Sequence, residues 1–66
     1  MQLLVNGARE QCAKDATLAE LIGHKQLRKD SLVVELNGAI IKQELWATTR
    51  LKDGDQLELL SFVGGG

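Results

Sequence analysis

The sequence is poor in the residues that cross-link small proteins. Its 66 residues include one cysteine, Cys12, and one histidine, His24. A single cysteine excludes an internal disulfide, and these two side chains are too few to hold a zinc ion. A domain of this length buries only about 60% of the surface that its unfolded chain exposes, so its core is thin. The fold must therefore rest on ordinary hydrophobic packing, for which the 44% apolar content is sufficient.

Aromatic residues and one-sided charge are also scarce. Only Trp46 and Phe62 are aromatic, the net charge is −1, and no basic run occurs. Since nucleic acids are bound by basic surfaces and stacked rings, no nucleic-acid partner is expected. No apolar run approaches 18 residues, and the chain does not start with a signal segment. Together with the lone thiol, these absences predict a cytoplasmic protein that does not contact a membrane.

The segments that are present alternate between strand and turn signals. Residues 2–5 form an apolar, β-prone run, and Asn6-Gly7 can supply the two positive φ angles of a type I′ hairpin turn. Residues 8–13 predict the return strand. A second such dipeptide is Asn37-Gly38, and 52–55 is a polar turn. Three later runs are also β-prone and predict strands: 32–36, 39–41 and 56–63.

A helix is predicted over residues 17–25. Thr17 and Glu20 have the spacing of a capping box, in which each side chain accepts a hydrogen bond from the backbone amide of the other. Three apolar residues then recur at the spacing of one helix face: Leu18, Leu21 and Ile22.

The order strand, strand, helix, strand, short strand, strand has no repeat or linker within it. It predicts an α+β domain in which a mixed sheet of four to five strands packs on one helix. This is the arrangement of the β-grasp, or ubiquitin-like, fold. We expect the domain to span residues 1–63 and a flexible C-terminal glycine tail to span residues 64–66.

The sequence resembles the ThiS family, the sulfur carriers of thiamine thiazole synthesis, over essentially its whole length. The strongest resemblance is a β-grasp pattern whose last strand runs into a terminal glycine pair. The other matching segments are 1–7, the capped helix at Thr17, 35–38 with Ile40-Ile41, Trp46 and 51–55.

The resemblance implies a chemistry for the tail. A ThiF-type partner enzyme is implied to adenylate Gly66 with ATP, after which a sulfur donor protein displaces AMP and leaves a thiocarboxylate. The sulfur then passes to a ThiG-type thiazole synthase. Glycine has no Cβ, so Gly65 gives clearance in a narrow channel and Gly64 lengthens the arm.

The chain itself is expected to be a co-substrate and not an enzyme. It has no Walker-type glycine loop with Lys and Ser or Thr. No cofactor or metal is therefore expected on this chain, and ATP and its magnesium are expected on the activating partner. A monomer is expected.

A docking surface is predicted beside the tail. Alternation along the last strand turns Leu57 and Leu59 into the core and leaves Leu60 and Phe62 on the opposite face. Leu4 should point the same way. If the first and last strands are neighbours, these three exposed residues form an apolar patch, which is typical of a contact site. The alternative is that they are single surface hydrophobes, which are common.

Other residues are expected to be structural. Cys12 should turn inward as a small apolar residue, His24 should be solvated near the helix end, and Trp46 should pack in the core. The acidic residues of the turn 53–55 are explained by turn chemistry without a metal. Asp55 or Glu58 could add a secondary partner contact.

The sequence leaves three rival functions open. A MoaD-like carrier for molybdopterin would keep the same chemistry in another pathway, since a terminal Gly-Gly serves both. A ubiquitin-like modifier would join the tail to lysines of other proteins. A plain interaction module would have an inert tail.

Overall fold

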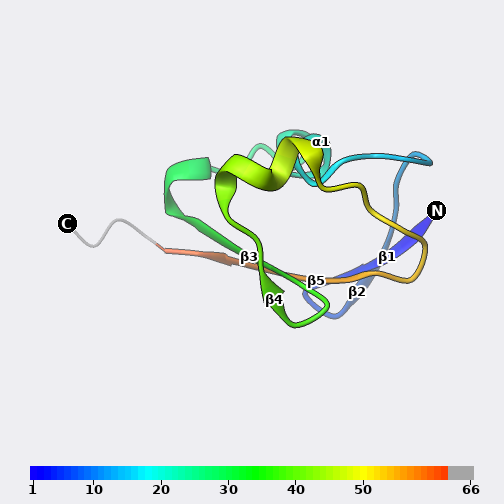
Figure 1. The fold of residues 1–66 in the computed structure, drawn as a ribbon. Helices are drawn as coiled ribbons and strands as arrows, with labels where there is room; N and C mark the ends of the chain where they lie inside the picture. The colour runs from blue at the N-terminus through cyan, green and yellow to red at the C-terminus, as the bar shows by residue number, and fades with distance from the viewer. Residues whose placement is uncertain (63–66) are drawn as a thin grey trace.

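The chain folds into two layers, a five-stranded sheet and a helix that lies on one face of it (Figure 1). This computed structural model describes residues 1–62. The predictions for Val63 and for the tail residues Gly64, Gly65 and Gly66 lie outside the described residues. The strand order is β2-β1-β5-β3-β4. The prediction of an α+β fold with a mixed sheet on one helix is therefore confirmed.

All the predicted strands and the predicted helix are present. The elements, in chain order, are β1 (Gln2–Val5), β2 (Ala8–Gln11), α1 (Leu18–His24), η1 (Lys29–Ser31), β3 (Leu32–Leu36), β4 (Ala39–Ile40), η2 (Gln43–Thr48) and β5 (Gln56–Ser61). The return strand β2 ends two residues before the predicted boundary, and β4 ends one residue early. The two short 3-10 helices, η1 and η2, were not predicted, because segments this short have no clear apolar period.

The helix α1 begins and ends at identifiable caps. The amide of Thr17 donates to Glu20 Oε1 at 2.8 Å, and the amide of Glu20 donates to Thr17 Oγ1 at 3.2 Å. The predicted capping box is therefore confirmed. The outermost residues of the predicted helix, Thr17 and Lys25, are its N-cap and C-cap.

Two Asn-Gly turns set the registers of the two hairpins. The φ angles are +50° and +82° at Asn6 and Gly7, and +50° and +88° at Asn37 and Gly38. Both pairs therefore have the positive φ angles that a type I′ turn requires, which was predicted for Asn6-Gly7, whereas Asn37-Gly38 was predicted only as a tight turn. The Asn6 side chain also extends the sheet: its Oδ1 accepts from the amide of Leu59 at 2.8 Å, and its Nδ2 donates to the Leu59 carbonyl at 3.3 Å.

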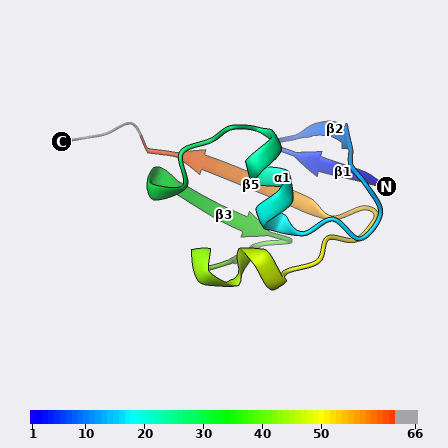
Figure 2. The same cartoon turned by 90° about the horizontal axis from the view of Figure 1, so that it is seen from above.

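The last strand, β5, lies at the centre of the sheet. It pairs parallel with β1, with Val5 opposite Leu57, and antiparallel with β3, with Leu32 opposite Ser61. The expectation that the first and last strands are neighbours is confirmed. In the view from above, α1 lies over β5, so the helix covers one face of this central strand (Figure 2).

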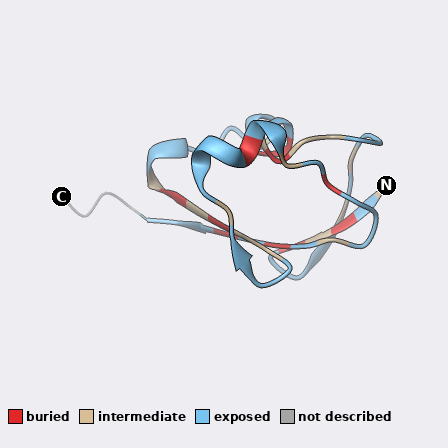
Figure 3. Cartoon of the chain, viewed as in Figure 1, coloured by how far each residue is buried: buried red, intermediate tan, exposed pale blue. Residues whose placement is uncertain are grey.

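The core lies between this face and the second layer (Figure 3). Its buried members come from the three central strands, α1, η2 and the segment after η2: Leu3, Val5, Leu18, Leu21, Ile22, Leu32, Val34, Trp46, Leu51, Leu57 and Leu59. Trp46 is buried, and its Nε1 donates to the Ile41 carbonyl at 2.9 Å. The prediction that Trp46 packs in the core is confirmed. No helix within residues 1–62 has the length and apolar character needed to span a membrane.

Candidate docking face beside the tail

The face of the sheet turned away from α1, which we call the outer face, carries the predicted docking residues. Neighbouring leucines of β5 point to opposite sides, because side chains alternate along a strand. Leu57 and Leu59 are only 1% and 8% exposed, whereas Leu60 and Phe62 are 46% and 60% exposed. The predicted register of the last strand is therefore confirmed.

The position predicted for Leu4 is partly wrong. Leu4 alternates with the buried residues Leu3 and Val5, so it does lie on the outer face. It is half-buried, however, and it pairs with Gln56, four residues before Leu60. At about 3.3 Å per residue, Leu4 lies roughly 13 Å along β5 from Leu60. One continuous patch that includes Leu4 does not form.

The neighbours of Leu60 come from the other side of β5. Val33 of β3 lies directly opposite Leu60. Glu35 is the next residue of β3 after Val33 on the outer face, and Ile40 of β4 lies opposite it. Ile40 is 67% exposed. We call Val33, Ile40, Leu60 and Phe62 the outer apolar patch. Sequence reasoning missed Val33 and Ile40, although the alternation within the 32–41 hairpin places both on one face.

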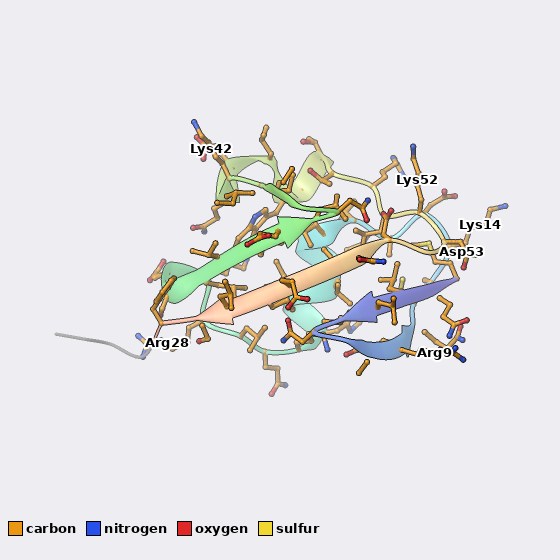
Figure 4. The ribbon with its side chains drawn as sticks, turned by 90° about the horizontal axis from the view of Figure 1, so that it is seen from below. Arg9, Lys14, Arg28, Lys42, Lys52 and Asp53 are labelled. Carbon is orange, nitrogen blue, oxygen red and sulfur yellow. The ribbon has the colours of Figure 1, made fainter. Side chains whose placement is uncertain are left out.

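Two carboxylates lie inside this region. Glu35 of β3 is directly opposite Glu58 of β5, and both are on the outer face. The structure describes no ion pair or hydrogen bond for either side chain, and the one ion pair within residues 1–62 joins Lys25 to Glu10 at 2.6 Å. The labelled basic side chains lie around the rim of the face (Figure 4). The centre of the face is therefore acidic as well as apolar.

Phe62 is the last described residue before the tail. Its amide donates to the Ser31 carbonyl at 2.7 Å, which ties the end of β5 to the turn η1. Gly66 is four residues after Phe62, and fully extended chain spans at most about 3.5 Å per residue. A group that reacts with Gly66 must therefore come within about 14 Å of Phe62.

The residues that were expected to be structural have structural positions. Cys12 is half-buried and packs against the core, and His24 is exposed at the end of α1. Asp53 Oδ1 accepts from the amide of Gln2 at 2.7 Å, and Asp55 Oδ2 accepts from the amide of Lys52 at 2.8 Å. The first bond joins the 53–55 turn to the start of β1, and the second lies within the turn itself. Residues 1–62 contain no cluster of three or more side chains suited to bind a metal.

The fold and this face define a class of protein. A mixed β-grasp sheet covers one side of a single helix, leaves an apolar outer face, and leads from its central strand into a run of three glycines. The arrangement of the sheet and the helix is that of the β-grasp, or ubiquitin-like, fold. The sequence profile described as the ThiS family matches residues 3–66, and the chain belongs to that family.

Individual relatives agree with the family. The chain is 35% identical over 66 residues to the sulfur carrier protein ThiS of Escherichia coli K12, and the match covers 100% of both chains. It superposes with a TM-score of 0.85 on the crystal structure of the thiamine biosynthesis protein ThiS of Geobacter metallireducens, at 38% identity and with 100% of each chain covered. It is also 32% identical over 66 residues to part of a thiazole synthase of Paramagnetospirillum magneticum, covering 20% of that protein.

Proposed function

We propose that this chain is a sulfur carrier of thiamine biosynthesis that holds sulfur as a thiocarboxylate on Gly66. The observation that carries the proposal is the ThiS family match over residues 3–66, which runs through all three glycines. The full-length match to ThiS of Escherichia coli supports the same assignment. Two other matches favour the thiazole pathway over the molybdopterin pathway: the structure named as the thiamine biosynthesis protein ThiS of Geobacter metallireducens, and the thiazole synthase of Paramagnetospirillum magneticum that includes a matching segment.

The chemistry starts from a poor electrophile. The Gly66 carboxylate must exchange an oxygen for a better leaving group before sulfur can attack its carbon. In the proposed sequence a ThiF-type enzyme transfers AMP from ATP to this carboxylate and releases pyrophosphate. A sulfur donor then supplies sulfur at the oxidation level of hydrosulfide; this sulfur attacks the acyl carbon and displaces AMP, which leaves a thiocarboxylate on Gly66 and releases one proton. ATP and magnesium are held by that enzyme.

The acceptor of the sulfur is proposed to be a ThiG-type thiazole synthase. A thiazole synthase of Paramagnetospirillum magneticum includes a segment that matches the whole of this chain. A carrier-like segment and a synthase in one polypeptide support the proposal that the carrier binds the synthase directly. In our proposal the present chain binds the synthase in the same way but as a separate polypeptide.

The parts of the chain have distinct roles in this proposal. Residues 1–63 form the domain that docks, and residues 64–66 form the arm that enters the active site of the partner. Gly65 gives the arm clearance and Gly64 gives it length, because a residue without a Cβ passes a narrow channel. Leu60 and Phe62 provide the apolar contact at the base of the arm, whereas Leu4 contributes at most a separate contact near the start of β5.

Intact mass spectrometry tests the function. The protein is incubated with ATP, a ThiF-type enzyme and a sulfur donor, and we expect the mass increase of one oxygen-to-sulfur exchange. The increase should vanish when Gly66 is deleted or when one residue is appended after it. No increase with competent partners would contradict the proposal, and conjugates to other proteins would instead indicate a ubiquitin-like modifier.

A further inference from the structure

We infer that the outer face binds a partner surface that presents one cationic side chain, an arginine in the best case, within an apolar surround. The cation lies between the carboxylates of Glu35 and Glu58, and the outer apolar patch contacts the surface around it. This inference rests on the proposed function, because it assigns the partner as the adenylating enzyme that acts on Gly66.

The carboxylate pair is unfavourable in the free protein. Directly opposite residues of an antiparallel pair have Cβ atoms about 5 Å apart, and like charges in that position are destabilising. Glu35 and Glu58 occupy such a position on one face, and no ion pair within residues 1–62 involves either side chain. The arrangement therefore costs stability, and nothing described on this chain compensates for it.

The apolar side chains next to Glu35 and Glu58 explain why these carboxylates would attract a cation of the partner strongly. Leu60, next along the outer face from Glu58, pairs with Val33, and Ile40 is the cross-strand neighbour of Glu35. Docking an apolar surface on these side chains removes water, and electrostatic attraction is stronger where water is excluded. A guanidinium group has donors arranged in a fork and can bond two carboxylates at once, which a compact ammonium group does less well.

The charge pair argues against a second copy of this chain as the occupant. A two-fold symmetric contact places the same surface on both sides. A two-fold contact centred on the outer face would bring together the carboxylates of Glu35 and Glu58 from each copy, and this repulsion opposes the contact.

The position of the face favours the enzyme. Any enzyme that reacts with Gly66 must reach within about 14 Å of Phe62. Phe62 lies one residue beyond the end of β5, two residues after Leu60 on the same side. The surface around the active site of the enzyme therefore lies beside this end of the sheet, where Leu60 and Phe62 are exposed apolar side chains that it can contact.

The substitution Glu58→Lys separates binding from stability. In the free protein the new ammonium group faces Glu35, so repulsion becomes attraction and the melting temperature should rise by about 1–5 °C. On the partner the same ammonium group repels the cation, so KM in the adenylation assay should rise about tenfold or more with kcat changed little. The matched control is Glu44→Lys, which makes the same charge change on an exposed residue of η2. The control should leave KM within about twofold of the wild type.

Neutralisation gives a second, milder variant. The double substitution of Glu35→Gln and Glu58→Gln should weaken binding about tenfold and reduce the dependence of KM on salt, because a screened attraction has been removed. An unchanged KM in this variant and in Glu58→Lys would overturn the inference. So would a wild-type protein that forms a dimer through the outer face.

The two proposals fail in different ways. If the wild-type protein is never adenylated by a competent enzyme, the proposed function is wrong. If the wild-type protein is adenylated and both charge variants behave like Glu44→Lys, the function stands and the cationic docking is wrong. A variant that melts at a lower temperature than the wild type would show that Glu58 stabilises the fold, which also contradicts the inference.

Discussion

Leu59 and Leu60 are neighbours in β5, yet they belong to different parts of the molecule. Leu59 is 8% exposed and faces the helix, and Leu60 is 46% exposed on the uncovered side of the sheet. The same contrast holds for Leu57 of β5 and Phe62, which lies one residue beyond the end of that strand. The residue types on the two sides are similar, so apolar character alone does not distinguish a core position from a docking position.

The difference lies in what covers each face. The inner face is covered by α1, η2 and the segment that ends in Leu51, so its leucines contribute to folding. The outer face has no second layer within residues 1–62 (Figure 3), and its apolar side chains border a pair of like charges on the β4 side and on the side of the tail. We therefore expect substitutions on the inner face to change stability and substitutions on the outer face to change association.

The largest effect is expected for Leu57→Ala on the inner face. Removing a side chain that is almost fully buried leaves a cavity and should lower the free energy of unfolding by about 2–5 kcal/mol. Urea denaturation followed by circular dichroism measures this loss. The matched substitution Leu60→Ala should cost less than about 1 kcal/mol. Equal losses for the two leucines would show that the faces do not differ as described.

The next largest effect is expected for Phe62→Ala on the outer face. An aromatic side chain near the centre of a contact can account for about 2 kcal/mol or more, so binding to the adenylating enzyme should weaken about thirtyfold. Titration calorimetry measures the dissociation constant, and the melting temperature should stay close to that of the wild type. If the variant unfolds instead, Phe62 is part of the core and our register for the end of β5 is wrong.

A smaller effect is expected at the cap of the helix that covers the inner face. Thr17→Ala removes the hydroxyl that accepts from the amide of Glu20 and should cost about 1 kcal/mol of unfolding free energy. Binding to partners should not change, because Thr17 lies in the second layer. A loss of binding without a loss of stability would assign this end of the helix to the docking surface.

The same cap should make stability depend on pH. The backbone amide of Thr17, and then its hydroxyl, hold the pKa of Glu20 below its ordinary value. A carboxyl whose pKa is lower in the folded state stabilises the protein above its unfolded pKa, about 4.3 for glutamate. This contribution is lost as the pH falls through the folded value. Urea denaturation should show that Glu20→Gln destabilises the protein at pH 7 and that the difference from the wild type shrinks toward pH 3.

The smallest effect, and a gain, is expected for Gly23→Ala in α1. Gly23 has an ordinary helical conformation, and a Cβ added there meets no atom within 4 Å. Alanine should therefore raise the free energy of unfolding by about 0.5–1 kcal/mol. Thermal denaturation measures the gain. A loss would indicate that the end of α1 needs the freedom of glycine.

Much of the fold was predictable because its signals are local. The capping box at Thr17, the two Asn-Gly turns and the alternation along β5 each depend on residues within a few positions of one another. The candidate site was less predictable. Leu60 and Phe62 were placed correctly from alternation. Leu4 was grouped with them because β1 and β5 were expected to be neighbours, whereas the residues that pair between them could not be inferred. The pairing of Leu4 with Gln56 depends on contacts between the two ends of the chain.

The sequence by itself determined the five strands and the helix α1, the buried sides of β1 and β5, and the family of the chain. These follow from local propensity and from apolar residues that repeat with the period of a strand or a helix. Only the tertiary structure decided which outer residues meet: Val33 with Leu60, Glu35 with Glu58, and Ile40 beside them. The physical reason is that strand register is a long-range property, since hydrogen bonds between distant segments fix it together with the packing of the core. The Asn6 side chain bonded to the backbone of Leu59 is one such contact, which joins the first hairpin to the strand beside the tail.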